Sequence, residues 1–176
     1  MTDTSIYKDI SARTGGDIYV GVVGPVRTGK STFIRKFMET LVLPNIKEEY
    51  EEKRARDEMP QSAAGKTVMT TEPKFVPDEA VSVVLGGTSE MKVKMVDCVG
   101  YIVPEAMGHI ENGSPRMVMT PWNEQPIPFG EAAELGTRKV INDHSTIGVL
   151  VTTDGTVGEI SRNSYVEAEE RVAKEA

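Results

Sequence analysis

The hydrophobic pattern near the N-terminus predicts a strand, a glycine turn and a helix, in that order. Residues 17–23 read DIYVGVV, a short apolar run rich in β-branched side chains, which is typical of a strand covered on both faces. Gly24-Pro25 closes this run, and helical spacing then extends to a break at Pro44. The apolar positions with helical spacing are Phe33, Ile34, Phe37, Met38 and Leu41.

Two apolar runs on either side of Gly86-Gly87 predict an antiparallel pair of strands. They cover residues 81–85 and 91–96, and a tight glycine connection joins them. Residues 147–151 form another apolar, β-branched run, and Asp154-Gly155 turns the chain after it. With the first strand, these runs predict a three-layer α/β fold whose sheet is mostly parallel with one antiparallel strand.

Helical spacing and charge predict the remaining helices. The expected spans are 4–13, the first part of 45–66, 131–142 and a C-terminal helix through Val172 that Asn163 or Ser164 caps. Because 45–66 is dense in charge and poor in large apolar side chains, a solvated face followed by a loop at 60–65 is its simpler interpretation. Five of the ten prolines fall between residues 101 and 130, which predicts irregular structure there.

Charge and composition narrow the class of protein. The 176 residues carry a formal net charge of -7, which argues against binding to a nucleic-acid backbone. No apolar run approaches the roughly 20 residues that a membrane-spanning helix needs, so we expect a soluble, cytoplasmic protein without a secretory signal. The single cysteine, Cys98, excludes an internal disulfide and is expected to pack in the core.

Residues 24–31 read GPVRTGKS and match the phosphate-loop pattern G-x-x-x-x-G-K-S/T in full. The glycines let successive N–H groups curl around an anion, and the helix that follows adds the positive end of its dipole. Lys30 is expected to reach the β- and γ-phosphates, and Ser31 to ligate Mg²⁺. The nucleotide-binding residues predicted in this segment are Gly24, Pro25, Val26, Arg27, Thr28, Gly29, Lys30, Ser31 and Thr32.

A second anchor is the aspartate that ends the run at 91–96. Asp97 and Gly100 form a D-x-x-G spacing, which fits a Walker B aspartate that holds Mg²⁺ and a glycine N–H that meets the γ-phosphate. The spacing alone is a weak signal, and a strand-ending turn is the alternative. The position of Asp97 at the end of an apolar strand, 66 residues after Ser31, favours the metal-binding role.

Thr70 and Thr71 are candidates for the hydroxyl that closes over Mg²⁺ and the γ-phosphate in GTPase-like switches. They precede the strand that pairs with the Asp97 strand, which is the expected place for such a group. The alternative is the ordinary preference of threonine for a strand start. The predicted metal ligands are Ser31, Thr70, Thr71 and Asp97, and segments 45–72 and 101–130 are expected to rearrange with the nucleotide state.

Two positions depart from the GTPase pattern. Tyr101 stands where glutamine-dependent GTPases carry the residue that orients the attacking water, so we expect slow hydrolysis. Arg27 lies two residues before Gly29, where some cation-activated relatives carry an asparagine. We hypothesise that Arg27 supplies positive charge to the transferring phosphate in cis, and a solvent-facing arginine is the alternative. The predicted catalytic residues are Lys30, Thr70, Thr71, Asp97 and Arg27.

Four segments carry a family resemblance: GDIYVGVVGPVRTGKSTFIRKFME, EMPQSAAGKTVMTTEPKFVP, MVDCVGY and STIGVLVTTDGT. Over nearly the whole chain they resemble the N-terminal P-loop domain of the stage IV sporulation protein A family, spore-coat morphogenetic ATPases of the GTPase-like (TRAFAC) superclass. The resemblance implies ATP hydrolysis that drives irreversible self-assembly into a basement layer on the forespore surface, in the mother-cell cytoplasm. It implies Lys30 and Ser31 as Walker A residues, Asp97 as the Walker B residue, and Thr70 and Thr71 as sensor threonines.

The resemblance also implies binding partners and indicates which of the family's domains the chain includes. It implies a polymer of identical copies, a small amphipathic membrane-anchor peptide and other coat proteins as partners, the last two through regions that the chain lacks. The guanine-reading N-K-x-D motif does not occur, so we expect residues 1–176 to form one P-loop domain that stops before the base-specificity strand, without the family's middle and C-terminal domains. The preference for ATP rests on the resemblance. A GTP-hydrolysing switch and a nucleotide-binding structural module without turnover are the alternatives.

Overall fold

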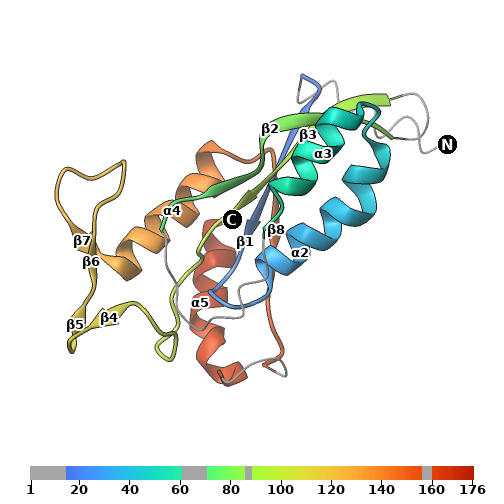
Figure 1. Ribbon diagram of the computed structural model, residues 1–176. Coiled ribbons are helices and arrows are strands. Elements are labelled where there is room, and N and C mark those ends of the chain that lie inside the picture. The colour runs from blue at the N-terminus through green and yellow to red at the C-terminus, as the bar shows by residue number, and fades with distance from the viewer. Residues whose placement is uncertain (1–14, 61–70, 86–88, 156–159) are drawn as a thin grey trace.

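A four-stranded sheet in the order β2-β3-β1-β8 forms the centre of the molecule (Figure 1). The computed structural model describes residues 15–60, 71–85, 89–155 and 160–176. Two strands, β3 (Ser89–Asp97) and β8 (Ile147–Leu150), run parallel to β1 (Asp17–Val23), and β2 (Lys74–Leu85) runs antiparallel to β3. The predicted sheet, mostly parallel with one antiparallel strand, is confirmed. The helix expected at 4–13, residues 61–65, Thr70 and Gly86-Gly87 lie outside the described residues.

Helices cover both faces of the sheet, which gives the three predicted layers (Figure 1). One face carries α2 (Lys30–Phe37) and α3 (Glu49–Asp57), and the other carries α4 (Phe129–Asp143) and α5 (Arg162–Glu175). Between α2 and α3 the chain passes through a π-helical turn at Met38–Val42 and a 3-10 turn at Leu43–Asn45. In the described ranges, no helix combines the length and the apolar character needed to cross a membrane.

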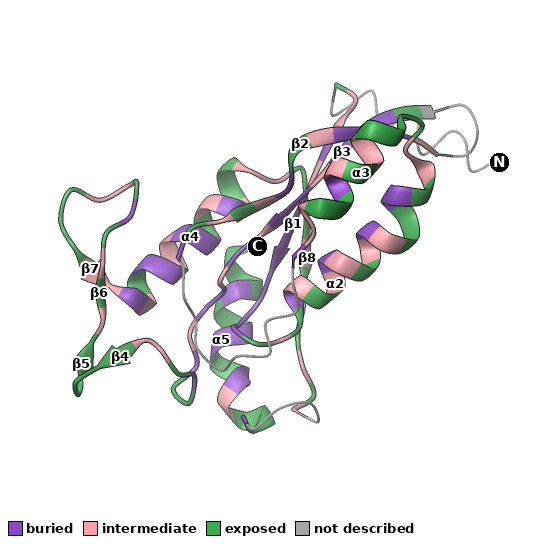
Figure 2. Cartoon of the chain, in the orientation of Figure 1, coloured by how far each residue is buried: buried purple, intermediate pink, exposed green. Residues whose placement is uncertain are grey.

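Two hydrophobic cores, one on each face of the sheet, follow from the alternation of side chains along the strands. Val22 of β1 belongs to the core under α2 and α3, together with Ile34 and Ala55. The next residue, Val23, belongs to the core under α4 and α5, together with Val140. Figure 2 shows the buried residues concentrated along the central strands. The continuous apolar run of β1 therefore corresponds to a strand that is covered on both faces, as predicted.

Two boundaries differ from the sequence-based expectation. Ser161 is the N-cap of α5, so the prediction of a cap at Asn163 or Ser164 was wrong. The cap falls earlier because Ser161 has extended dihedral angles, φ -67° and ψ 152°, while Asn163 and Ser164 already lie in the first helical turn. β2 begins at Lys74, well before the expected start at 81, because it pairs with β3 on both sides of an irregularity between Val76 and Val81.

An arm built from two short antiparallel pairs projects from the body between β3 and α4 (Figure 1). In this arm β4 (Ile110–Glu111) pairs with β5 (Ser114–Pro115), and β6 (Met117–Val118) pairs with β7 (Ile127–Pro128). Most of its residues are exposed (Figure 2). The structure predicted for 101–130 from its prolines is therefore largely confirmed, since each of these strands is only two residues long.

Gly21 of β1 allows the end of α4 to approach the central strand. A Cβ atom at this position would overlap Ser145 Oγ and lie 2.9 Å from Val140 Cγ1. We expect Gly21→Ala to lower the free energy of unfolding by about 1–3 kcal/mol, because overpacking forces the neighbours to shift. Urea unfolding would measure the loss. Gly148→Ala in β8 is the matched control, since nothing lies within 4 Å of a Cβ there. Equal losses in the two variants would contradict the packing role of Gly21.

Candidate functional site

The predicted phosphate loop connects the end of β1 with the start of α2. Gly24 and Gly29 have φ angles of 144° and 92°, which L side chains rarely adopt, so the two glycines permit the bend of the loop. Arg27 also has a positive φ angle, 62°. Gly29 is the N-cap of α2, and the helix begins at Lys30. The succession of strand, glycine loop and helix is therefore confirmed.

Lys30 is buried although it carries a charge. Its Nζ donates a hydrogen bond of 2.6 Å to the carbonyl oxygen of Pro25, at the opposite end of the loop. Burial lowers the pKa of the Lys30 ammonium group, and the nearby carboxylate of Asp97 opposes this shift. The lysine side chain thus folds back against the backbone of its own loop.

Ser31 and Asp97 are joined by a hydrogen bond although they lie 66 positions apart in the sequence. The Ser31 hydroxyl donates to Asp97 Oδ2 at 2.6 Å. This contact is possible because β1 and β3 are parallel neighbours, with Val22 opposite Asp97, so both strands end at the same edge of the sheet. The structure therefore brings together the predicted Walker A serine and the predicted Walker B aspartate.

The chemistry of this pair fits Mg²⁺. Asp97 Oδ1 is buried and has no hydrogen-bond partner in the described part of the chain. Burial raises the pKa of Asp97, while the Ser31 hydrogen bond and the charge of Lys30 lower it. Across the residues described, no group of three or more His, Cys, Asp or Glu gathers to hold a metal. Mg²⁺ bound with a nucleotide needs only one or two protein ligands beside phosphates and water, so a hydroxyl and one carboxylate suffice.

Gly100 packs directly on the phosphate loop. Its φ angle is 90°, and a Cβ atom there would overlap a carbonyl oxygen of the loop and lie 2.7 Å from Lys30 Nζ. The next residue, Tyr101, accepts a hydrogen bond of 2.9 Å from the Val26 N–H through its carbonyl oxygen. The D-x-x-G segment therefore contacts the loop, and only glycine fits at its last position.

Of the two threonine candidates, the structure describes Thr71. Thr70 lies outside the described residues. Thr71 is buried, and its carbonyl oxygen lies 2.6 Å from a Cβ built on Gly136 of α4. Within the ranges that the structure describes, no hydrogen bond connects the Thr71 side chain with Ser31 or Asp97. The metal-binding role of the two threonines stays a prediction.

Three further predicted nucleotide-binding residues, Arg27, Thr28 and Thr32, are exposed or partly buried. Thr28 Oγ1 donates a hydrogen bond of 3.0 Å to the Pro25 carbonyl oxygen, and Thr32 is exposed. Arg27 is exposed, and its charge opposes the rise in the pKa of Tyr165 that burial causes. This position is compatible with both interpretations of Arg27, the solvent-facing and the catalytic one.

Cys98 and Tyr101, which follow β3 in the chain, both belong to the core under α4 and α5. Cys98 packs there as predicted, its Sγ lies 3.4 Å from the Val22 carbonyl oxygen, and burial raises its pKa. Tyr101 is also fully buried in this core, which the comparison with GTPases did not anticipate. The signal that favoured burial was its large aromatic side chain a few residues after an apolar strand.

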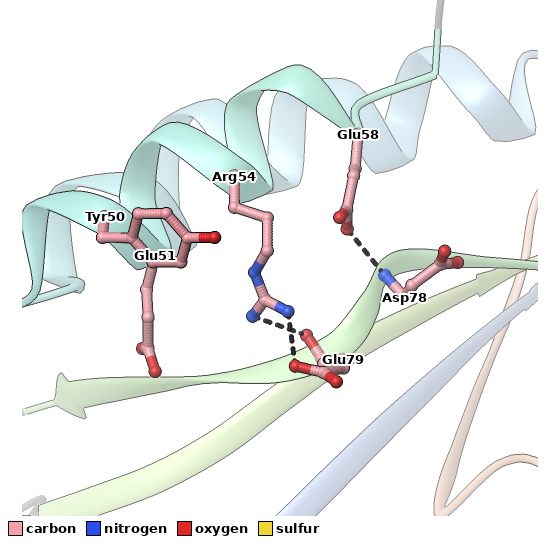
Figure 3. A pocket seen from close by; sticks show the side chains of 6 residues that line it. All are labelled: Tyr50, Glu51, Arg54, Glu58, Asp78 and Glu79. Carbon is pink, nitrogen blue, oxygen red and sulfur yellow. Dashed lines mark hydrogen bonds and ion pairs between the residues drawn. The ribbon is translucent and has the colours of Figure 1, made fainter.

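A pocket of about 470 Å³ lies between α3 and β2 (Figure 3). Arg54 donates a hydrogen bond of 2.7 Å to Glu79 Oε2, and Glu58 accepts one of 2.8 Å from the Asp78 N–H. Four of the six lining side chains are carboxylates, which repel a polyphosphate. The pocket therefore does not replace the loop as the phosphate site. Its lining residues are Tyr50, Glu51, Arg54, Glu58, Asp78 and Glu79.

The sequence of the chain is similar to those of proteins named stage IV sporulation protein A. Stage IV sporulation protein A of Bacillus subtilis (strain 168) is 64% identical over 175 residues, which cover 99% of this chain and 36% of that protein. The protein of the same name from Clostridioides difficile (strain 630) is 62% identical over 173 residues, which cover 98% of this chain and 35% of that protein. The chain thus spans about a third of the length of these curated relatives.

No solved structure matches the chain. The model of the family described as "Stage IV sporulation protein A, ATPase domain" matches residues 1–176. Since this match extends over all the residues of the sequence and the curated relatives share more than half of its positions, the chain belongs to the family of the stage IV sporulation protein A ATPase domain.

Proposed function

We propose that the chain binds ATP with Mg²⁺ on the loop Gly24–Ser31 and hydrolyses it slowly, as a P-loop domain of the GTPase-like superclass. The observation that carries the proposal is the 2.6 Å hydrogen bond between Ser31 Oγ and Asp97 Oδ2, which joins the end of the loop to the end of β3. The family description as an ATPase domain supports ATP as the substrate.

The residues of the chain would bind and orient the polyphosphate. Lys30 Nζ would exchange its hydrogen bond with the Pro25 carbonyl oxygen for phosphate oxygens, which are stronger acceptors because they are charged. The N–H groups at the start of α2 would add hydrogen bonds to the same phosphates. Ser31 and Asp97 would hold Mg²⁺, which when bound supplies neutralisation of the phosphate charge.

Tyr101 supports slow turnover. Its side chain is buried under α4 and α5, and it replaces the glutamine that orients water in many GTPases. The side chain at this position therefore would not orient a water molecule at the γ-phosphate. Catalysis would depend on the charges that surround the phosphates, with Arg27 as a further cationic group.

The family resemblance extends the proposal to sporulation. ATP turnover would drive self-assembly of a spore-coat basement layer on the forespore surface in the mother-cell cytoplasm, with a membrane-anchor peptide and other coat proteins as partners. A GTP-hydrolysing switch protein is the nearest rival, and competition of ATP and GTP for one labelled analogue separates the two. Phosphate release that is equal in the unaltered protein and in Asp97→Ala would instead support a structural module without turnover.

Replacement of the loop lysine tests nucleotide binding. We expect Lys30→Ala to weaken the binding of Mg²⁺·ATP about tenfold or more, because the variant loses a charge-assisted contact with the phosphates. Titration calorimetry would measure the dissociation constant. Lys36→Ala is the matched control, since Lys36 lies on the same helix, is 71% exposed and pairs with Glu39. Equal affinity of Lys30→Ala and Lys36→Ala for ATP would contradict the proposed site.

We expect the ionised carboxylate of Asp97 to lower the free energy of unfolding at neutral pH. Because burial raises its pKa, the folded chain holds the proton more tightly than the unfolded chain does, and stability is lost as the pH rises through the raised pKa. We therefore expect Asp97→Asn to raise the free energy of unfolding by about 0.5–2 kcal/mol at neutral pH, in EDTA and without nucleotide. The gain should vanish below the ordinary carboxyl pKa of 3.8, where Asp97 is protonated in both states.

Urea unfolding at several pH values would measure this difference. Asp143→Asn is a control of opposite sign, because the hydrogen bond from Lys139 lowers the pKa of Asp143. A loss of stability in Asp97→Asn at neutral pH would show that the carboxylate stabilises the fold, contrary to the expectation.

The catalytic hypothesis for Arg27 has a separate test. If its guanidinium acts on charge that develops at the phosphate, Arg27→Ala should lower turnover at saturating ATP by at least about tenfold, and Arg27→Lys should retain part of the rate. Steady-state phosphate release would measure both. Turnover of Arg27→Ala within about twofold of the unaltered protein would support the solvent-facing alternative.

A further inference from the structure

Tyr101 connects the phosphate loop with the helices on the far side of the sheet. Its carbonyl oxygen accepts the hydrogen bond of 2.9 Å from the Val26 N–H, so its backbone holds the first half of the loop. Its side chain is 1% exposed and packs in the core under α4 and α5. A shift of the ring would therefore move the carbonyl group that holds the loop.

The ring of Tyr101 is itself held by an arginine of α5. The guanidinium carbon of Arg171 lies 5.0 Å from the ring centroid, within the range of a cation–π contact. Glu134 of α4 fixes this arginine, since Arg171 Nη2 donates a hydrogen bond of 2.6 Å to Glu134 Oε2. Arg138 Nη2 lies 3.6 Å from the same carboxylate oxygen, and the Tyr101 side chain raises the pKa of Arg138. Tyr101 thus has cationic neighbours on both helices.

The ion pair between Arg171 and Glu134 is partly exposed to solvent, which bears on how much it contributes to stability. The Arg171 side chain is 45% exposed and the Glu134 side chain is 22% exposed. An ion pair this close to solvent adds little to the stability of a fold. It restricts the position of a buried ring, however, and through the backbone of Tyr101 the position of Val26. The main effect of Arg171 is therefore expected at the loop.

We propose that Arg171 is a positioning residue for the phosphate loop and acts through Tyr101. This inference rests on the proposed binding of ATP to the loop. With Arg171 clamped by Glu134, Tyr101 stays in place and the loop keeps its curvature at Val26. Without Arg171 the loop samples more conformations, and ordering it costs part of the binding free energy of ATP. The groups that would touch the phosphates are unchanged, so the rate at saturation stays nearly the same.

Replacement of Arg171 in the complete protein tests this inference. We expect Arg171→Ala to raise the dissociation constant of a fluorescent ATP analogue and the KM for ATP by about fivefold, with kcat within about twofold. Arg171→Lys keeps a cation over the ring and should recover most of the affinity. Arg35→Ala is the matched control, because Arg35 is 44% exposed, pairs with Glu39 at 2.9 Å and belongs to α2. Its affinity for the analogue should match that of the unaltered protein.

Thermal unfolding of each variant separates positioning from a merely structural role, which would lower Tm and leave the affinity of the folded protein unchanged. A folded Arg171→Ala with unaltered affinity would overturn the inference, as would equal weakening in Arg35→Ala. If Arg171→Ala does not fold, Glu134→Gln decides, because it removes the ion pair and should raise the dissociation constant in the same direction; unchanged affinity there overturns the inference. Failure of the unaltered protein to bind the analogue would refute the proposed function itself.

Discussion

The hydrogen bond between Ser31 and Asp97 is the interaction on which the site depends. It forms because β1 and β3 are parallel neighbours whose residues pair in register up to Val22 and Asp97. The loop and the D-x-x-G segment then leave the sheet at the same edge, and Gly100 lets them approach to contact. A change that shifted the register of β1 against β3 would separate the serine from the aspartate, whatever the sequence of the loop.

The same arrangement buries the side chains of Lys30 and Asp97, in surroundings that disfavour their charged forms. Burial lowers the pKa of Lys30 and raises that of Asp97, so the charged form of each is disfavoured before the opposite charge is counted. Asp97 Oδ1 is moreover buried without a hydrogen-bond partner in the part of the chain that is described. A folded chain that keeps such groups is consistent with a site that a charged ligand completes. The apolar cores on both faces of the sheet hold this site in place.

The sequence predicted the strand, loop and helix around the site because each has a local signal: a β-branched apolar run in β1, glycines at the bend, and helical spacing after Lys30. It did not predict the cap of α5 or the early start of β2, which depend on local dihedral angles and on strand pairing. The contact between Tyr101 and Arg171 had no sequence signal at all. Residues so far apart meet only through the packing of α5 on the sheet.

A crystal structure of the protein with Mg²⁺ and a non-hydrolysable ATP analogue would test the proposed site most directly. The predicted result places the phosphates on the loop Gly24–Ser31, with the metal ion bound by the Ser31 hydroxyl and held by Asp97, directly or through one water molecule. Phosphates bound away from this loop, or a metal ion that neither Ser31 nor Asp97 contacts, would contradict the proposed site.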